Sequence, residues 1–255
     1  MTDYQIFNED CISGMRRLDA GSVDAIICDP PFQTTDCAWD IRLPMQEMWQ
    51  EFNRVTKENA AIVLFSQLPF AVDLINANRK MFRYEWIWSK PRAVGFLNAN
   101  RMPLRAHENI LVFYKKLPTY NPQFRKGKAY EHAQREQLRD RKSVYQSRGA
   151  SVTKNDGEHY YPRDVINFAQ PVANSKKDTR VHPTQKPVDL MEFLVRTYTN
   201  EQELVLDATM GSGSTGVACM KSRRRFIGFE TDKEFFDVSR QRLKRALVER
   251  TQLLF

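Results

Sequence analysis

The sequence predicts an α/β protein whose mostly parallel β-sheet is covered by helices on both faces. Short apolar runs alternate with stretches of helical periodicity, an order typical of strand–helix–strand units. A glycine-rich turn follows one of these runs, and an Asp-Pro-Pro tripeptide ends another. The 255 residues are enough for one large α/β domain with a full hydrophobic core.

The N-terminal part of the chain supplies the first strands. The run Val23 to Cys28 predicts a buried strand, which ends at Asp29-Pro30-Pro31 because proline offers no donor to a strand ladder. Three further β-rich runs are expected at 60–65, 84–88 and 110–114. Two helices are expected at 44–55 and 70–78.

The C-terminal part repeats the alternation. Helices are expected at 187–198, from the glycine turn to about 222, and from 233 onward. Strands are expected at 204–206 and 226–229. The segment between the two parts, residues 115–180, lacks this regularity, and we interpret it as an inserted subdomain.

Charge is concentrated in that segment. The chain has a formal net charge of +8, and residues 115–180 alone hold 15 Lys and Arg against 7 Asp and Glu. A basic segment in an otherwise balanced chain is typical of a polyanion partner, because neutralising phosphates releases counterions. A solvated loop that keeps the chain soluble would have the same composition, so charge alone leaves both interpretations open.

The glycine turn indicates a ligand with an adenosine moiety. Gly211-x-Gly213-x-x-Gly216 lies between a strand and a helix, and Glu230 ends the next strand. Glycines permit a tight turn and close approach of a ligand to the backbone, and the acidic residue is suited to ribose hydroxyls. This spacing fits a nicotinamide or flavin dinucleotide or S-adenosylmethionine, and a turn that only packs a helix on a sheet is the structural alternative.

Other features exclude some classes of protein. The four cysteines have no Cys-x-x-Cys spacing, and His107-Glu108 lacks the second histidine of a zinc motif, so we expect no metal. No signal peptide and no membrane-length apolar stretch is visible. We therefore expect a cytoplasmic protein with reduced thiols and no membrane partner.

Four spaced motifs resemble the amino-methyltransferase family of DNA modification enzymes. They are Asn8-Glu9-Asp10-Cys11, Asp29-Pro30-Pro31-Phe32, His182-Pro183-Thr184-Gln185-Lys186-Pro187 and Asp207-Ala208-Thr209-Met210-Gly211-Ser212-Gly213-Ser214-Thr215. Their order is the permuted one, with the catalytic motif before the cofactor motif. The resemblance implies a Rossmann-like, seven-stranded methyltransferase sheet. It divides the chain into a catalytic half at 1–114, a basic target-recognition insert at 115–180 and a cofactor-binding half at 181–255.

The resemblance also assigns the chemistry. It implies methyl transfer from S-adenosylmethionine to the exocyclic N6 of adenine in a specific duplex DNA sequence. The catalytic residues would be Asp29, Pro30, Pro31 and Phe32. A hydrogen bond from the amine to Asp29 and to the Pro30 carbonyl would turn the nitrogen lone pair toward the methyl group. Phe32 would stack on the target base, which must leave the duplex to be reached.

Cofactor contacts are implied at both motif regions. Asp10 and the Cys11 backbone would meet adenine, Glu230 the ribose, and Thr184 with Lys186 the methionine carboxylate. The full implied set is Asp10, Cys11, Asp29, Thr184, Lys186, Asp207, Gly211, Gly213, Ser214, Thr215 and Glu230. One departure concerns Asp207-Ala208-Thr209, since the family commonly has Asp-Pro-Phe there, and an aromatic wall of the pocket is missing at this position.

Several alternatives stay open. Asp at the start of Asp29-Pro30-Pro31-Phe32 is typical of adenine-N6 members, whereas cytosine-N4 members more often begin with Ser. A dinucleotide-dependent oxidoreductase would explain the glycine turn and Glu230, but leaves the Asp-Pro-Pro-Phe motif unexplained. A catalytically silent DNA-binding protein, or an enzyme acting on RNA or a protein amide, is a further alternative.

The expected macromolecular partner is double-stranded DNA. Within the insert, the DNA-binding candidates are Arg135, Arg139, Arg141 and Lys142. Family members are often dimers, so a homodimer is a further expectation.

Overall fold

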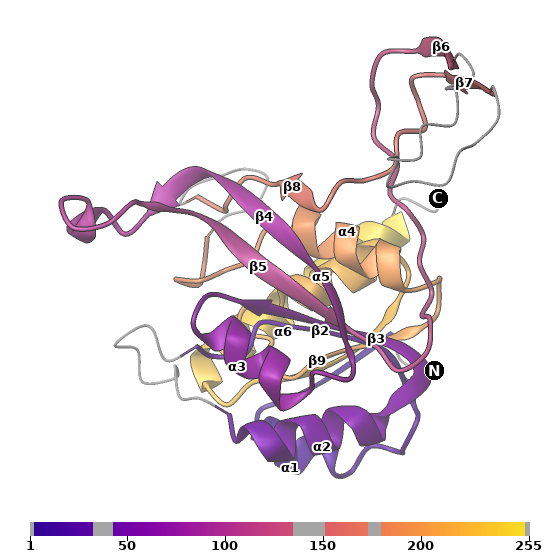
Figure 1. Cartoon of the computed structure of the whole chain (residues 1–255). Coiled ribbons are helices and arrows are strands. Elements are labelled where there is room, and N and C mark those ends of the chain that lie inside the picture. The colour runs from indigo at the N-terminus through magenta and orange to yellow at the C-terminus, as the bar shows by residue number, and fades with distance from the viewer. Residues whose placement is uncertain (1–2, 33–42, 135–150, 173–179, 253–255) are drawn as a thin grey trace. The chain divides into compact units, whose positions relative to one another are not determined.

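The computed structural model describes residues 3–32, 43–134, 151–172 and 180–252 (Figure 1). Contacts divide the chain into two units. The larger unit comprises Met1–Asn121 and Asp164–Phe255, and the smaller unit is Pro122–Arg163. The smaller unit is narrower than the predicted insert at 115–180, because the chain on both sides of it packs with the sheet. The role of the insert stays a prediction.

The described part of the larger unit contains one eight-stranded sheet. Its order is β1 (Tyr4–Phe7), β10 (Arg225–Phe229), β9 (Leu204–Asp207), β2 (Val23–Cys28), β3 (Thr56–Ser66), β5 (Arg105–Phe113), β4 (Phe82–Val94) and β8 (Val165–Asn167). The first five strands in this order are parallel, β5 is antiparallel to both of its neighbours, and β8 is parallel to β4. The predicted, mostly parallel α/β sheet is confirmed. Seven of these strands form the expected sheet, and the short β8 is added at the β4 edge.

The strand order reverses direction between β9 and β2. From β2 the chain runs to β3 on one side, and from β9 it runs to β10 on the other. In open α/β sheets, ligands bind beyond the carboxyl ends of the strands at such a reversal. The antiparallel pairing of Ser66 with Asn109 brings the start of β5, and with it the end of β4, to this same edge.

Helices cover both faces of the sheet. One face packs against α1 (Cys11–Met15), α2 (Met45–Val55) and α3 (Phe70–Ala77). The other packs against α4 (Val188–Tyr198), α5 (Ser214–Lys221) and α6 (Lys233–Gln252). Neighbouring side chains of β3 alternate between the two cores, as the strand period of two requires. Among the described residues, no helix is both long enough and apolar enough to span a bilayer.

The predicted helices and strands are present, with shifted ends. The largest shifts are at β4 and β5, which extend beyond the predicted 84–88 and 110–114. These two strands pair with each other past the sheet, and so satisfy backbone hydrogen bonds without an apolar pattern. The sequence did not predict β1, α1 or β8, which are short and have mixed polarity.

The smaller unit has its own two-stranded sheet. It pairs β6 (Tyr130–Gln134) with β7 (Ser151–Asn155) in antiparallel fashion. An isolated antiparallel bridge joins Arg125 to Tyr160 in the same unit. The DNA-binding candidates Arg135, Arg139, Arg141 and Lys142 lie outside the described residues.

Candidate active site

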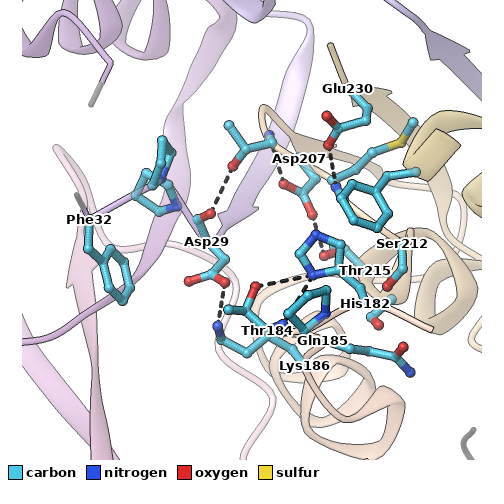
Figure 2. A pocket seen from close by; sticks show the side chains of 18 of the residues that line it. Asp29, Phe32, His182, Thr184, Gln185, Lys186, Asp207, Ser212, Thr215 and Glu230 are labelled. Atoms are coloured by element: carbon cyan, nitrogen blue, oxygen red, sulfur yellow. Dashed lines mark hydrogen bonds and ion pairs between the residues drawn. The ribbon is translucent and has the colours of Figure 1, made fainter. Parts of the chain in front are cut away.

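A cavity of about 660 Å³ lies at the carboxyl edge of the sheet, where the strand order reverses. Its size is typical of a pocket for a small organic ligand. Residues of all four motifs line it, together with side chains from β4, β5 and the start of α6. The cavity therefore joins segments from both ends of the chain (Figure 2).

The Asp29-Pro30-Pro31-Phe32 motif forms one wall. Asp29 directly follows β2, and all four residues line the cavity. The Oδ1 atom of Asp29 is buried and has no hydrogen-bond partner among the described residues. Phe32 packs its ring against Phe70, with centroids 5.3 Å apart. The motif thus presents an unpaired carboxylate oxygen and an aromatic ring to the same cavity (Figure 2).

Asp29 belongs to a buried network of four charges. The ammonium group of Lys186 donates a hydrogen bond to Asp29 Oδ2 and lies 3.5 Å from Glu108 Oε2. The Lys90 ammonium donates to the other oxygen, Oε1, of Glu108. Both lysines also lie over aromatic rings, Lys186 at 5.0 Å from the Phe65 centroid and Lys90 at 4.8 Å from that of Trp88. Two cations and two anions make the network electrically balanced.

The pKa values follow from burial and from these neighbours. Burial raises the pKa of Asp29, and the Lys186 ammonium opposes that shift. Burial also disfavours the charge on Glu108, but Lys186 and Lys90 outweigh it and lower the pKa of this carboxyl. Burial likewise disfavours the charge on Lys186, but Asp29 and Glu108 outweigh it and raise the pKa of Lys186. Of the two carboxyl groups in the network, Asp29 is therefore the one that protonates more readily.

The glycine turn forms the opposite wall. Asp207 ends β9 and accepts hydrogen bonds from the Thr215 hydroxyl at 2.5 Å and from the Thr209 N–H at 3.2 Å. Burial raises the pKa of Asp207 to about 7. Gly211 has a φ of +50°, a conformation that favours glycine, and its N–H donates to Glu230 Oε2 at 2.9 Å. The carboxylates at this wall are held by neutral donors.

Thr209 connects the two walls. Its hydroxyl donates to the backbone carbonyl of Asp29 at 3.0 Å and lies 3.1 Å from the Cys28 sulfur. Thr209 stands where the related family commonly has an aromatic residue. Phe235, at the start of α6, lines the cavity and packs on the His182 ring at 4.0 Å between centroids. An aromatic side chain is thus present on the cavity wall, but from another element.

The remaining motif residues surround the glycine turn. Asp10 caps α1 by accepting from the Ser13 N–H at 2.8 Å, and Cys11 begins that helix. The Thr184 hydroxyl lies 3.2 Å from Nδ1 of His182. Burial, followed by the charge of Lys186, lowers the pKa of His182 to about 4, so this ring is neutral at pH 7.

All but one of the described catalytic and cofactor-binding candidates line the cavity. The exception is Gly213, whose φ is +78° and where an added Cβ would lie 2.9 Å from the side chains of Leu243 and Ser239. Gly213 therefore lets the turn pack closely on α6. Lys186 was expected at the cofactor carboxylate, but the structure pairs it with Asp29 and Glu108.

Several cavity residues were not foreseen from the sequence, namely Lys90, Glu108, Arg105 and Phe235. The only sequence signal for the Lys90–Glu108 pair is the presence of charged residues beside apolar β-rich runs. Among the described residues, no group of three His, Cys, Asp or Glu side chains is placed to hold a metal ion.

Comparison with known proteins gives the class. The sequence model of the family described as DNA methylase (N6_N4_Mtase) matches residues 23–241. The chain belongs to this family.

Individual relatives agree with that assignment. The chain is 28% identical over 256 residues to the Type II methyltransferase M.HpaI of Haemophilus parainfluenzae, a match that covers 94% of this chain and 74% of the relative. It is 27% identical to the DNA adenine methyltransferase YhdJ of Escherichia coli, over 93% of this chain and 82% of the relative. The crystal structure of the M1.HpyAVI–SAM complex matches with a TM-score of 0.64 and 25% identity, over 94% of this chain and 98% of that one.

Proposed function

We propose that this chain transfers a methyl group from S-adenosylmethionine to the exocyclic N6 of adenine in a specific duplex DNA sequence. The family assignment supports methylation of a DNA amino group. The observation that carries the proposal is the buried, unpaired Oδ1 of Asp29 in a cavity that also contains the glycine turn. That arrangement supports binding of an amine donor and a nucleoside cofactor in one space.

The residues present fit S-adenosylmethionine. Asp207 and Glu230 offer carboxylate oxygens at the glycine-turn wall, and Asp10 lies beside them on the cavity lining. Carboxylates without a lysine partner suit a ligand that carries a sulfonium cation. When bound, the cofactor supplies an electrophilic methyl group on sulfur. Glu230 and Asp10 would hold its adenosine moiety, and Asp207 with the turn its methionine end.

Asp29 would act on the target amine. Its free Oδ1 would accept a hydrogen bond from the NH₂ group and so orient the nitrogen lone pair. As the new N–C bond forms and the C–S bond breaks, the nitrogen must lose a proton, and a carboxylate whose pKa is raised by burial is suited to receive it. Lys186 fixes the other oxygen of Asp29, so the accepting atom keeps its direction.

The position of Asp29 also supports extrusion of the base. Asp29 lies beside the buried end of β2 and cannot reach an amine inside a stacked duplex, so the target base would leave the helix. Phe32, half-buried against Phe70, would supply the stacking face. Adenine is proposed over cytosine because the motif begins with Asp29. The basic insert, with Arg135, Arg139, Arg141 and Lys142, is proposed to bind the DNA.

The substitution Asp29→Ala tests the proposal. It removes the acceptor but leaves the glycine-turn wall intact, so calorimetric titration should give unchanged binding of S-adenosylmethionine. Transfer of labelled methyl to DNA should fall by about 100-fold or more. Asp19→Ala, at an exposed acidic residue away from the cavity, is the matched control and should transfer methyl normally. Full activity of Asp29→Ala would contradict the role of Asp29.

The product of the wild-type protein tests the finer claims. DNA from cells that express the chain is digested to nucleosides for mass spectrometry, and the modified positions are mapped by sequencing. N6-methyladenine in one sequence context is expected. N4-methylcytosine would correct the base, and no modification in any DNA would favour the silent DNA-binding alternative. Preferential binding of NAD(H) in the calorimeter would instead favour the oxidoreductase.

A further inference from the structure

The paired strands β4 and β5 extend past the sheet as an arm, here defined as residues 91–105. The arm contains the 3₁₀ turn η1 (Phe96–Asn98), which follows Gly95 at a φ of +91°. Figure 1 shows this arm reaching away from the body of the sheet. It belongs to the larger unit, and its root is fixed to the segment after β8, because the Gln170 amide donates to the Arg92 carbonyl at 2.9 Å.

The tip of the arm exposes large apolar side chains. Phe96 is 81% exposed and Leu97 is fully exposed at 100%. Met102, Val94 and Leu104 are also exposed on the same arm. Scattered single apolar residues are normal on a surface, but a contiguous apolar tip marks an interaction site.

The charge of the arm is of one sign. Arg92, Arg101 and Arg105 are exposed, and residues 91–105 contain no Asp or Glu. Three arginines on an arm with an apolar tip are complementary to a polyanion that also offers an apolar interior. Stacked base pairs between two phosphate backbones have this combination of properties.

The arm also borders the cavity. Val94 and Arg105, which pair with each other across the arm, both line it. Arg105 donates to Gln67 Oε1 at 2.8 Å, so its position at the cavity is fixed. A polymer that contacts the arm therefore lies beside the entrance used by the target base.

We propose that Phe96 and Leu97 form an apolar wedge that enters duplex DNA next to the target base and occupies the space that the base leaves. This inference rests on the proposed function. Proteins that kink or open DNA insert apolar side chains between base steps in this manner. The wedge lowers the cost of extrusion, because the neighbouring bases stack on a side chain in place of the lost partner.

A second copy of this chain is the competing occupant of the tip. Charge argues against it, since two arms with three arginines each, on chains of net charge +8, repel one another. Duplex DNA satisfies both the apolar and the cationic features of the arm.

The experiment compares matched and mismatched DNA. The substrate is a duplex with the sequence mapped in modified DNA, either fully paired or with a mismatch at the target base that removes the cost of unpairing. The double variant F96A/L97A should lose about 10-fold or more in kcat/KM on the paired duplex, and much less on the mismatched one. Val248→Ala removes an exposed apolar side chain (48%) of α6, away from the arm and the cavity, and should match the wild type on both.

The outcomes separate the two proposals. No loss, or an equal loss on both substrates, would overturn the wedge while leaving the methyltransferase proposal standing. If the wild-type protein sediments as a dimer and the double variant sediments as a monomer, the tip mediates self-association. That result would also overturn the wedge. If the wild-type protein methylates no DNA, the proposed function fails, and the wedge fails with it.

Discussion

The two walls of the cavity hold their carboxylates in different ways. At the Asp29 wall, Asp29 and Glu108 are paired with Lys186 and Lys90, and the four charges cancel. At the glycine-turn wall, Asp207 and Glu230 receive hydrogen bonds from a hydroxyl group and from backbone N–H groups. One wall is electrically compensated by the protein's own lysines, whereas the carboxyl groups of the other have no lysine partner among the described residues.

This difference matches the proposed ligands. A neutral purine would meet the compensated wall, where no net charge is left for it to neutralise. A sulfonium cofactor would meet the glycine-turn wall, where its cation supplies the missing partner. The pairing of charges around the cavity thus supports the proposed placement of the two ligands, independently of the motifs.

The largest expected effect follows from removing the shared cation. Lys186→Met leaves Asp29 without its cation, whereas Glu108 keeps Lys90, and loss of one partner of a buried pair costs about 3–5 kcal/mol. The free energy of unfolding measured in urea should fall by that amount, and methyl transfer should fall with it. Lys233→Met, which removes an exposed pair with Asp237, should change stability by no more than about 1 kcal/mol.

Equal stability of the two lysine variants would contradict this account, because the Asp29 wall would then not depend on its buried lysine. A stability loss seen for Lys186→Met alone would support the conclusion that the Asp29 wall depends on its buried lysine.

A smaller effect is expected from pH at the glycine-turn wall. The pKa of Asp207 rises from its usual 3.8 to about 7 on folding, so between these values the folded chain binds one more proton than the unfolded chain. Stability from this group is complete below about pH 4 and is lost as the pH rises toward 7. Wild-type protein should therefore lose about 2 kcal/mol between pH 5 and pH 7.5 relative to Asp207→Asn.

Urea unfolding of both proteins at the two pH values measures this loss, and subtraction removes the other titrating groups. Added S-adenosylmethionine should reduce it, because a cation at Asp207 lowers the pKa of that carboxyl. A difference between wild type and variant that does not change with pH would contradict an uncompensated Asp207.

The smallest effect is expected within the charge network. Glu108→Gln removes the second carboxylate that interacts with Lys186 and repels the charge of Asp29. The pKa of Asp29 should therefore fall, and the acid limb of kcat/KM should move to lower pH. Lys90→Gln removes a cation that favours the charged form of Asp29. The pKa of Asp29 should therefore rise, and the acid limb should move to higher pH. Opposite shifts in pH profiles of methyl transfer support a positioning role, whereas reduced activity without a shift indicates only a structural role.

The sequence was sufficient for the six longer-patterned strands of the sheet, though not for β1 and β8, and for most of the cavity lining. Alternating apolar runs identify β2, β3, β9 and β10, and proline and glycine mark the two ends where ligands approach. Motif residues such as Asp29 and Glu230 follow strands, and parallel strands bring their carboxyl ends to one edge. That reasoning uses only local patterns and strand direction.

The charge network needed more than local patterns. Glu108 faces the cavity because β5 pairs with β4 in a register that opposes it to Trp88, and a one-residue slip would turn it to the other face. The link from Thr209 to Asp29 depends on contact between β9 and β2, whose hydrogen-bonded residues are 180 positions apart. Register and long-range contact are set by packing of the whole sheet.

The central position of β9 has a consequence for synthesis. A ribosome releases β2 and its Asp-Pro-Pro-Phe end early, but the neighbouring β9 emerges only after about four-fifths of the chain has been made. A nascent polypeptide therefore contains Asp29 long before it contains Asp207 and the glycine turn. The cavity can form only after most of the chain has been translated, and a product that ends before β9 lacks the whole glycine-turn wall.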